Sequence, residues 1–254
     1  MLVVSGADER FHRSLLQLLQ SLKRHGYRRC RVYDLGFRSD QRQLLSRRFP
    51  WVEVRDWVNP GPPHLSDLGN YGWKPTLIAA ELRDEPLLWL DSACVVTGSL
   101  QRVQDELQRW GWWVPWAGRG PVREMTYPAV SEALQLPPEF LGGRFRAGGV
   151  CAFLPTARSL VEDWRNLAWR EEVLAPAGSH RGNHRFDQVL LSFLLHGQPG
   201  TDDEIDISSP RPVPFLRTRN KLRSDWPLWA DPLSRAYFAL RRWLDVTAWK
   251  FRAS

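Results

Sequence analysis

Three carboxylates and a lysine stand where apolar stretches of this sequence begin or end, and they are its first candidates for chemistry. Asp91 closes the apolar run 86–90, Asp34 closes the run 30–33, and Asp187 opens the apolar segment 187–195. Such carboxylates can hold hydroxyls or a metal ion, and Lys74 can neutralise a phosphate. Two structural alternatives stay open. Asp91 could cap a helix or pair with an arginine, and Asp187 could simply suit a helix N-terminus.

The spacing of apolar residues predicts the elements that must position these side chains. Strands are expected near 2–5, 30–36, 51–54 and 87–90, with helices at 11–26, 39–48 and 73–82. Three strand-then-helix units in a row indicate an α/β fold with a doubly wound, mostly parallel sheet and helices on both faces. Ligands of such sheets bind at the carboxyl ends of the strands, where Asp34 and Asp91 stand.

Composition narrows the class of protein. The 254 residues carry a net charge of +7, which attracts polyanions, but the arginines are scattered, and this disfavours a nucleic-acid partner. The three cysteines have apolar neighbours and no zinc spacing, which is typical of reduced thiols in the cytoplasm. We see no signal peptide and no window long enough to span a membrane. No P-loop or GxGxxG motif is present.

The last part of the sequence predicts a different kind of element. Residues 237–252 combine large apolar side chains with arginine and lysine, which is typical of a basic amphipathic helix. Such a helix can lie on an anionic membrane surface, or it can dock on the core of its own domain. We therefore expect a main domain over 1–200 and an extension over 201–254 that carries this helical tail.

Six short motifs follow one another in an order that resembles the GT-A glycosyltransferases, most closely family 8 and galactosyltransferase-like proteins. They span roughly residues 2 to 195, and each is weak alone. The motifs are VVSGAD at 3–8, VYDLG at 32–36, WKP at 73–75, WLDSA at 89–93, FRAGGV at 145–150 and FDQ at 186–188.

The resemblance implies a role for each matching residue. The first strand and its loop would grip the nucleotide base, Lys74 would face the diphosphate, and the paired glycines would line the sugar pocket. Asp187 and Gln188, with Asp91, would act at the reacting sugar carbon. The residues expected to bind the donor are Ser5, Gly6, Asp8, Tyr33, Asp34, Lys74, Gly148 and Gly149.

The metal site of the resembled family is incomplete in this sequence. Its Asp-x-Asp motif binds a divalent ion, Mn²⁺ or Mg²⁺, through carboxylate oxygens. Asp91 matches the first aspartate, but Ala93 stands where the second should be. Three alternatives follow. Asp91 could bind the metal with a distant ligand such as His184, Lys74 and arginines could replace the metal, or catalysis could be lost.

The function implied by the resemblance is transfer of a sugar from a nucleoside diphosphate sugar, with UDP-sugars favoured, to an acceptor hydroxyl. The acceptor would be a glycan or a lipid-linked molecule, in the synthesis of cell-surface glycan or glycolipid. The expected location is the cytoplasm, with the tail on the inner face of the membrane. The alternative is a non-catalytic protein that binds nucleotide sugars or glycans with the same fold.

Overall fold

The computed structural model of this chain describes residues 1–118, 120–199, 205–207, 213–218 and 220–223. Its contacts divide the chain into two compact units that interleave along the sequence. The first unit comprises Met1–Trp57, Trp89–Arg102 and the residues from Ile207 onward, and the second comprises Val58–Leu88 and Val103–Asp206. The predicted helix 237–252 lies outside the described residues, as do 200–204, so the boundary expected at residue 200 stays a prediction.

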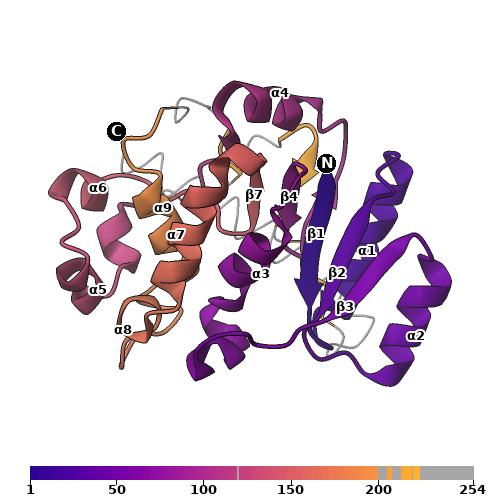
Figure 1. Ribbon diagram of the computed structural model, residues 1–254, viewed down its shortest axis with the longest axis horizontal. Coiled ribbons are helices and arrows are strands. Elements are labelled where there is room, and N and C mark those ends of the chain that lie inside the picture. The colour runs from indigo at the N-terminus through magenta and orange to yellow at the C-terminus, as the bar shows by residue number, and fades with distance from the viewer. Residues whose placement is uncertain (119, 200–204, 208–212, 219, 224–254) are drawn as a thin grey trace, which may run out of the picture. The chain divides into compact units, whose positions relative to one another are not determined.

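The first unit is built on parallel strands joined by helices (Figure 1). Strands β1 (Leu2–Ala7), β2 (Cys30–Asp34) and β3 (Val52–Asp56) pair in parallel, and helices α1 (His12–Arg24) and α2 (Ser39–Arg48) connect them. The strand order is β3-β2-β1-β4, where β4 is Leu87–Leu90. The leucines of α1 expected to face inward are fully buried: Leu15, Leu18, Leu19 and Leu22.

A segment from much later in the chain completes the first unit. Strand β8 (Leu216–Arg217) pairs antiparallel with β5 (Val95–Val96) in a separate two-stranded sheet. The apolar run 86–96 therefore does not form one strand. It turns after β4, where the amide of Cys94 donates to the carbonyl of Asp91 at 2.8 Å, and it resumes in another sheet.

The second unit is mostly helical (Figure 1). Strand β7 (Val150–Phe153) lies between β4 and β6 (Trp112–Trp113), and β6 and β7 are antiparallel. Helix α7 (Arg158–Ala168) packs against α3 (Trp73–Glu81) and α9 (Asp187–Leu194). The remaining elements are η1 (Pro63–Ser66), η2 (Leu68–Asn70), α4 (Gln101–Trp110), η3 (Val122–Met125), α5 (Pro128–Ala133), α6 (Pro138–Gly142), η4 (Pro155–Ala157) and α8 (Glu171–Leu174).

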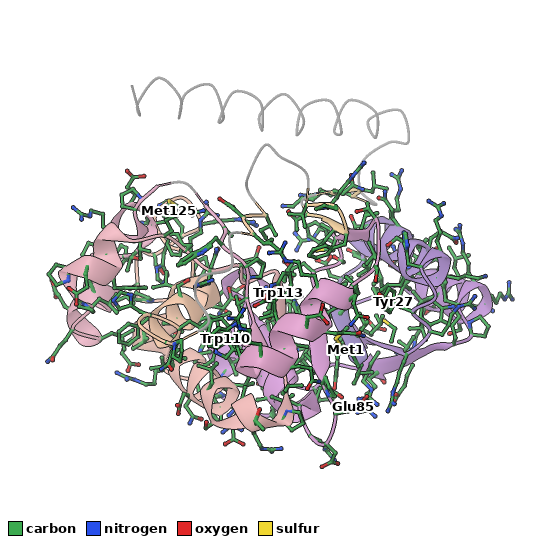
Figure 2. All side chains as sticks on the ribbon, turned by 90° about the horizontal axis from the view of Figure 1, so that it is seen from above. Met1, Tyr27, Glu85, Trp110, Trp113 and Met125 are labelled. Atoms are coloured by element: carbon green, nitrogen blue, oxygen red, sulfur yellow. The ribbon has the colours of Figure 1, made fainter. Side chains whose placement is uncertain are left out.

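The tryptophans at the end of α4 and in β6 differ in their surroundings. Trp113 is 3% exposed and belongs to the core, whereas the guanidinium of Arg109 lies 4.8 Å from the ring centroid of Trp110. Figure 2 labels both tryptophans. Gly111 separates them at φ +81°, a conformation that favours glycine. The stretch is therefore an edge strand and the turn that precedes it.

The expected α/β architecture with a mostly parallel sheet is confirmed. In the part of the chain that the structure describes, no helix has both the length and the apolar character needed to cross a membrane.

Candidate functional site

A buried ion pair lies at the centre of the second unit. Lys74 comes from the first turn of α3 and Asp187 from the first residue of α9, and their side chains are 4% and 5% exposed. The Nζ atom of Lys74 lies 3.4 Å from Oδ2 of Asp187 and donates to the carbonyl of Gly148 at 3.0 Å. Three residues that the sequence placed in the donor site therefore meet in one cluster.

Glycine at position 148 lets the chain pass close to α9. A Cβ atom there would lie 3.3 Å from Oδ2 of Asp187 and 3.2 Å from Cβ of Gln188. The side-chain amide of Gln188 donates through Nε2 to the carbonyl of Arg146 at 2.7 Å, which ties the two segments together. Gly148 and Gln188 thus lie at the ion pair, with the half-buried Gly149 following in the chain.

Backbone strain is concentrated at this cluster. Phe186, which immediately precedes Asp187, has φ +44° and ψ −122°, and Tyr71 has φ +61°. They are two of the three non-glycine residues with positive φ in the described ranges. Side chains with a Cβ atom avoid this region, and strain of this kind is often kept at functional sites.

The aromatic ring of Tyr71 joins two cations of the same unit. The Nζ atom of Lys74 lies 5.2 Å from its centroid, the guanidinium of Arg181 lies 5.5 Å from it, and Nη1 of Arg181 donates to its hydroxyl at 2.6 Å. The Phe186 ring lies 6.3 Å away. Sequence reasoning missed Tyr71 and Arg181, because 110 residues separate them and neither belongs to a motif.

Arg146 is buried between aromatic rings rather than exposed toward a ligand. Its guanidinium lies 3.4 Å from the centroid of Trp116 and donates to the carbonyl of Val114 at 3.0 Å. Its backbone amide donates to Ser192. This residue of the FRAGGV motif therefore supports the Gly148 segment from behind.

His184 is a structural histidine in this fold, which argues against its predicted role as a metal ligand. Its Nδ1 atom accepts from the amide of Tyr127 at 3.3 Å, so the neutral ring carries its proton on Nε2, which lies 3.1 Å from the carbonyl of Leu174. The side chain is fully buried, and burial lowers the pKa of His184 to about 4. Both nitrogens are engaged with the backbone and neither offers a lone pair to a metal.

The predicted base-binding residues of the first unit are held by local contacts. The Ser5 hydroxyl is fully buried and donates to the carbonyl of Leu90 at 2.7 Å, and the neighbouring Gly6 is buried in β1. The Asp8 carboxylate accepts from the amides of Arg10 and Phe11 and pairs with the Arg10 side chain. Ser5 therefore ties β1 to β4, and Asp8 shapes the turn that leads into α1.

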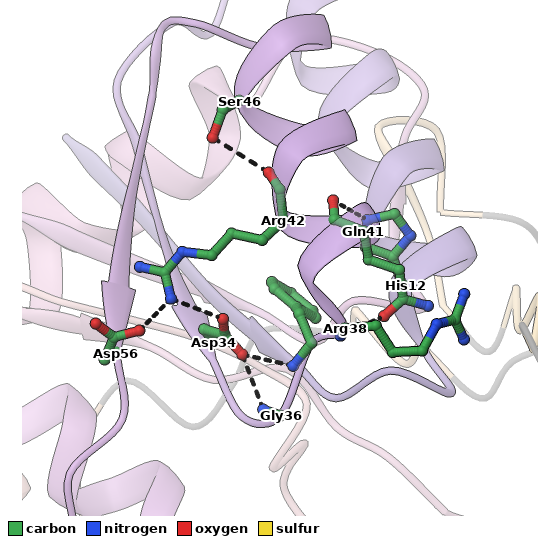
Figure 3. Close-up of polar contacts among 9 residues, drawn as sticks. His12, Asp34, Gly36, Arg38, Gln41, Arg42, Ser46 and Asp56 are labelled. Carbon is green, nitrogen blue, oxygen red and sulfur yellow. Dashed lines mark hydrogen bonds and ion pairs between the residues drawn. The ribbon is translucent and has the colours of Figure 1, made fainter.

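Asp34 is the centre of a similar arrangement at the end of β2 (Figure 3). It accepts from the amides of Gly36 at 2.9 Å and Phe37 at 2.6 Å, and it pairs with Arg42 at 3.0 Å. Arg42 also pairs with Asp56, and this contact lowers the pKa of Asp56. Asp34 thus orders its own loop, while its neighbour Tyr33 is buried in the sheet.

Asp91 lies at the end of β4, as expected, and is half-buried. The indole of the buried Trp89, two residues earlier, donates to its Oδ1 atom at 2.9 Å. Such a bond fixes the direction of the carboxylate without neutralising its charge. Of the predicted first-unit residues, Asp91 therefore has the arrangement most suited to holding a ligand hydroxyl.

The described residues do not fit a divalent metal. Among them, no group of three or more histidine, cysteine, aspartate or glutamate side chains is placed to hold one. Asp91 and His184 belong to different units, and Ala93 offers no ligand atom. We therefore derive no chemical step through a metal.

Comparison with known proteins gives a match in structure alone. No protein-family model and no curated protein matches this sequence. Among solved structures, galactosyltransferase LgtC, in complex with donor and acceptor sugar analogues, matches with a TM-score of 0.51 and 17% identity. The match covers 79% of this chain and 72% of LgtC.

Two further solved structures agree with that match. The glycosyltransferase GlyE of Streptococcus pneumoniae TIGR4 has a TM-score of 0.53 and 14% identity, covering 99% of this chain and 63% of its own length. Mouse xyloside xylosyltransferase 1 has a TM-score of 0.51 and 14% identity. This match covers 82% of this chain and 85% of the xylosyltransferase. This chain has the GT-A fold. The fold expected from the order of the six motifs is therefore confirmed, while the roles of individual GT-A site residues stay predictions.

Proposed function

We propose that this protein transfers a sugar from a nucleoside diphosphate sugar, with UDP-sugars favoured, to an acceptor hydroxyl. The GT-A fold supports this activity, because the solved structures that share it are glycosyltransferases. The observation that carries the proposal is the buried pair of Lys74 and Asp187, which lies against the carbonyl of Gly148 and beside Gln188.

The chemistry requires one bond to break and one to form. The bond between the anomeric carbon and the diphosphate oxygen breaks, and its electron pair stays on the leaving nucleoside diphosphate. The acceptor oxygen forms the new bond and gives up its proton. Asp187 is our candidate to receive this proton or to orient the donor sugar, since Lys74 holds its carboxylate in one direction. The Asp91 carboxylate, fixed by Trp89, would accept a donor hydroxyl.

We further propose a glycan or lipid-linked acceptor, in the synthesis of cell-surface glycan or glycolipid. The proposed location is the cytoplasm, with the predicted helix 237–252 on an anionic membrane surface. Deletion of 236–254 should then abolish binding of the protein to anionic liposomes. Equal binding by the truncated and full-length chains would contradict the membrane part of the proposal.

The decisive experiment is a turnover assay that measures nucleoside diphosphate release from pooled UDP- and GDP-sugars with simple glycan acceptors. Asp187→Asn should lower the rate by about 10²- to 10⁴-fold, the usual contribution of a general base. Asp91→Asn, at a half-buried position, should also lower it and does not disturb the buried pair. Glu171→Gln changes an exposed carboxylate of the second unit and is the matched control. Full activity of both aspartate variants would contradict the site.

A second function is favoured by the missing carboxylate at position 93. The chain could bind nucleotide sugars or glycans without transferring them. Tight binding of a UDP-sugar without any release of UDP, over a range of acceptors, would support this alternative and contradict transfer.

A further inference from the structure

The segment 213–218 and 220–223, here called the strap, runs back along the first unit and is fixed to it by its backbone. Besides the pairing of β8 with β5, the amide of Thr97 donates to the carbonyl of Phe215 at 2.9 Å. The Thr97 hydroxyl donates to the carbonyl of Pro214, also at 2.9 Å. The strap is thus an integral part of this unit.

The strap then passes the end of the WLDSA motif and the start of α1, which follows the VVSGAD motif. The amide of Asn220 donates to the carbonyl of Ala93 at 2.8 Å. The Ser14 hydroxyl accepts from the amide of Leu222 at 2.7 Å and donates to its carbonyl at 3.0 Å. Arg13 donates to the carbonyl of Arg223 at 3.1 Å. Residues 220–223 are therefore held between the turn after β4 and the first turns of α1.

Two cations of the strap gather around one ring at the start of α1. The Nζ atom of Lys221 lies 5.8 Å and the guanidinium of Arg223 lies 6.0 Å from the centroid of Phe11. Phe11 directly follows the Asp8–Arg10 turn at the carboxyl end of β1. Both cations are half-buried, which weakens solvent screening of their charge.

We propose that Lys221 and Arg223 bind the diphosphate of the donor and take the place of the divalent metal that the described residues do not fit. This inference rests on the proposed function. Positive charge is needed there because the leaving diphosphate gains negative charge as the sugar departs. A lysine and an arginine can supply it through charge-assisted hydrogen bonds to phosphate oxygens.

The alanine at position 93 agrees with this arrangement. The Ala93 carbonyl accepts from the amide of Asn220, the residue before Lys221, so a carboxylate at position 93 would bring negative charge to the same stretch of the strap. It would then compete with the diphosphate for Lys221 and Arg223. The negative charge of the diphosphate can be neutralised either by a metal bound to an Asp-x-Asp motif or by the cations of a strap. This chain has the residues for the strap.

The test is titration of the full-length protein with UDP by calorimetry, in EDTA and in MnCl₂. We expect equal affinity in both buffers. Lys221→Gln combined with Arg223→Gln should weaken UDP binding in EDTA by at least about tenfold, since each removes a charge-assisted hydrogen bond. The matched control, Arg24→Gln combined with Arg47→Gln, removes the same charge from exposed ends of α1 and α2 and should bind UDP like the parent protein.

Ala93→Asp provides a second and independent variant. We expect it to weaken UDP binding several-fold in EDTA. UDP binding by the parent that EDTA abolishes and Mn²⁺ restores would overturn the inference, and so would equal loss in the strap and control variants.

The inference and the proposed function can fail separately. Turnover that requires Mn²⁺ would overturn the inference and leave sugar transfer standing. Strap-dependent binding of UDP with no turnover of any nucleotide sugar would overturn transfer and leave the inference standing.

Discussion

Asp34 in the first unit and Asp187 in the second are both carboxylates at the boundary of an apolar stretch, yet their contacts differ. Asp34 orders a surface loop through two backbone amides, and its partner Arg42 is 41% exposed. Asp187 is buried with Lys74 beneath a strained residue. The Asp34 and Asp187 side chains are 10% and 5% exposed, so the larger difference lies in their partner cations, Arg42 at 41% and Lys74 at 4%. The comparison teaches that burial of the partner, which the motif does not reveal, decides how much the pair costs.

The largest expected effect comes from breaking the buried pair. Asp187→Ala leaves the Lys74 ammonium buried without this carboxylate, and the free energy of unfolding should fall by about 3 kcal/mol or more. Guanidinium chloride denaturation measures the change.

The double variant Lys74→Met with Asp187→Leu is the control, because it removes both charges and keeps apolar volume. It should lose much less stability than the sum of the two single changes. A loss from Asp187→Ala as small as that from a surface pair would contradict the contrast between the units.

The next effect is a pH dependence that originates in the second unit. The folded pKa of His184 is about 4, below its ordinary value of 6.5, so the unfolded state binds the proton first as the pH falls. Stability is therefore retained above pH 6.5 and declines between pH 6.5 and 4. His184 should contribute a loss of about 2 kcal/mol between pH 7 and pH 5, and burial of His12 acts in the same direction.

Denaturation at the two pH values tests this effect. His184→Gln should flatten the slope, although it costs stability at pH 7, whereas His180→Gln changes an exposed histidine and should leave the slope unchanged. An unchanged slope in His184→Gln would show that the decline has another source.

A smaller effect is expected in the first unit. Asp34→Ala removes the acceptor for two turn amides and should cost about 1 kcal/mol. Arg42→Ala removes two ion pairs made by a guanidinium that is 41% exposed and should cost less than about 1 kcal/mol. Thermal denaturation of both variants and of Asp187→Ala compares the stability that each carboxylate contributes. An equal loss of stability from Asp34→Ala and Asp187→Ala would contradict the difference between the two carboxylates.

The smallest effect separates ordinary strain from strain at the site. Gln135 follows α5 at φ +49° and is exposed, so Gln135→Gly should raise the unfolding free energy by about 0.5 kcal/mol. Phe186→Gly relieves a similar backbone but removes a ring that is 7% exposed, and it should destabilise the protein. Stabilisation by both changes would mean that Phe186 contributes strain without packing.

Periodic features were predictable because they depend on neighbours in the sequence. The leucines of α1 and the four apolar residues of β4 are spaced for one face or one buried strand, and the structure has them there. The order of the six motifs predicted the GT-A fold, and the similarity to solved structures confirms it.

Features that depend on distant partners were not predictable. Val95 and Val96 look like a continuation of β4, but they pair with residues 216 and 217 in another sheet. His184 looks like a metal ligand until Tyr127 and Leu174 are seen to engage its two nitrogens. The ring of Tyr71 meets Arg181 across 110 residues, a contact that no local spacing encodes.

The strap also governs the order in which the chain can fold. Ser14 and its partner Leu222 are 208 residues apart, so the first unit lacks this contact until the whole second unit has been synthesised. At about 5–20 residues per second, the interval during translation is about 10–40 s. Val96 and its partner Leu216 are closer in the sequence, so β5 lacks β8, and has an open edge, for about 6–24 s. A ribosome-bound chain halted before residue 213 should therefore recruit chaperones that a chain extended past residue 223 no longer needs.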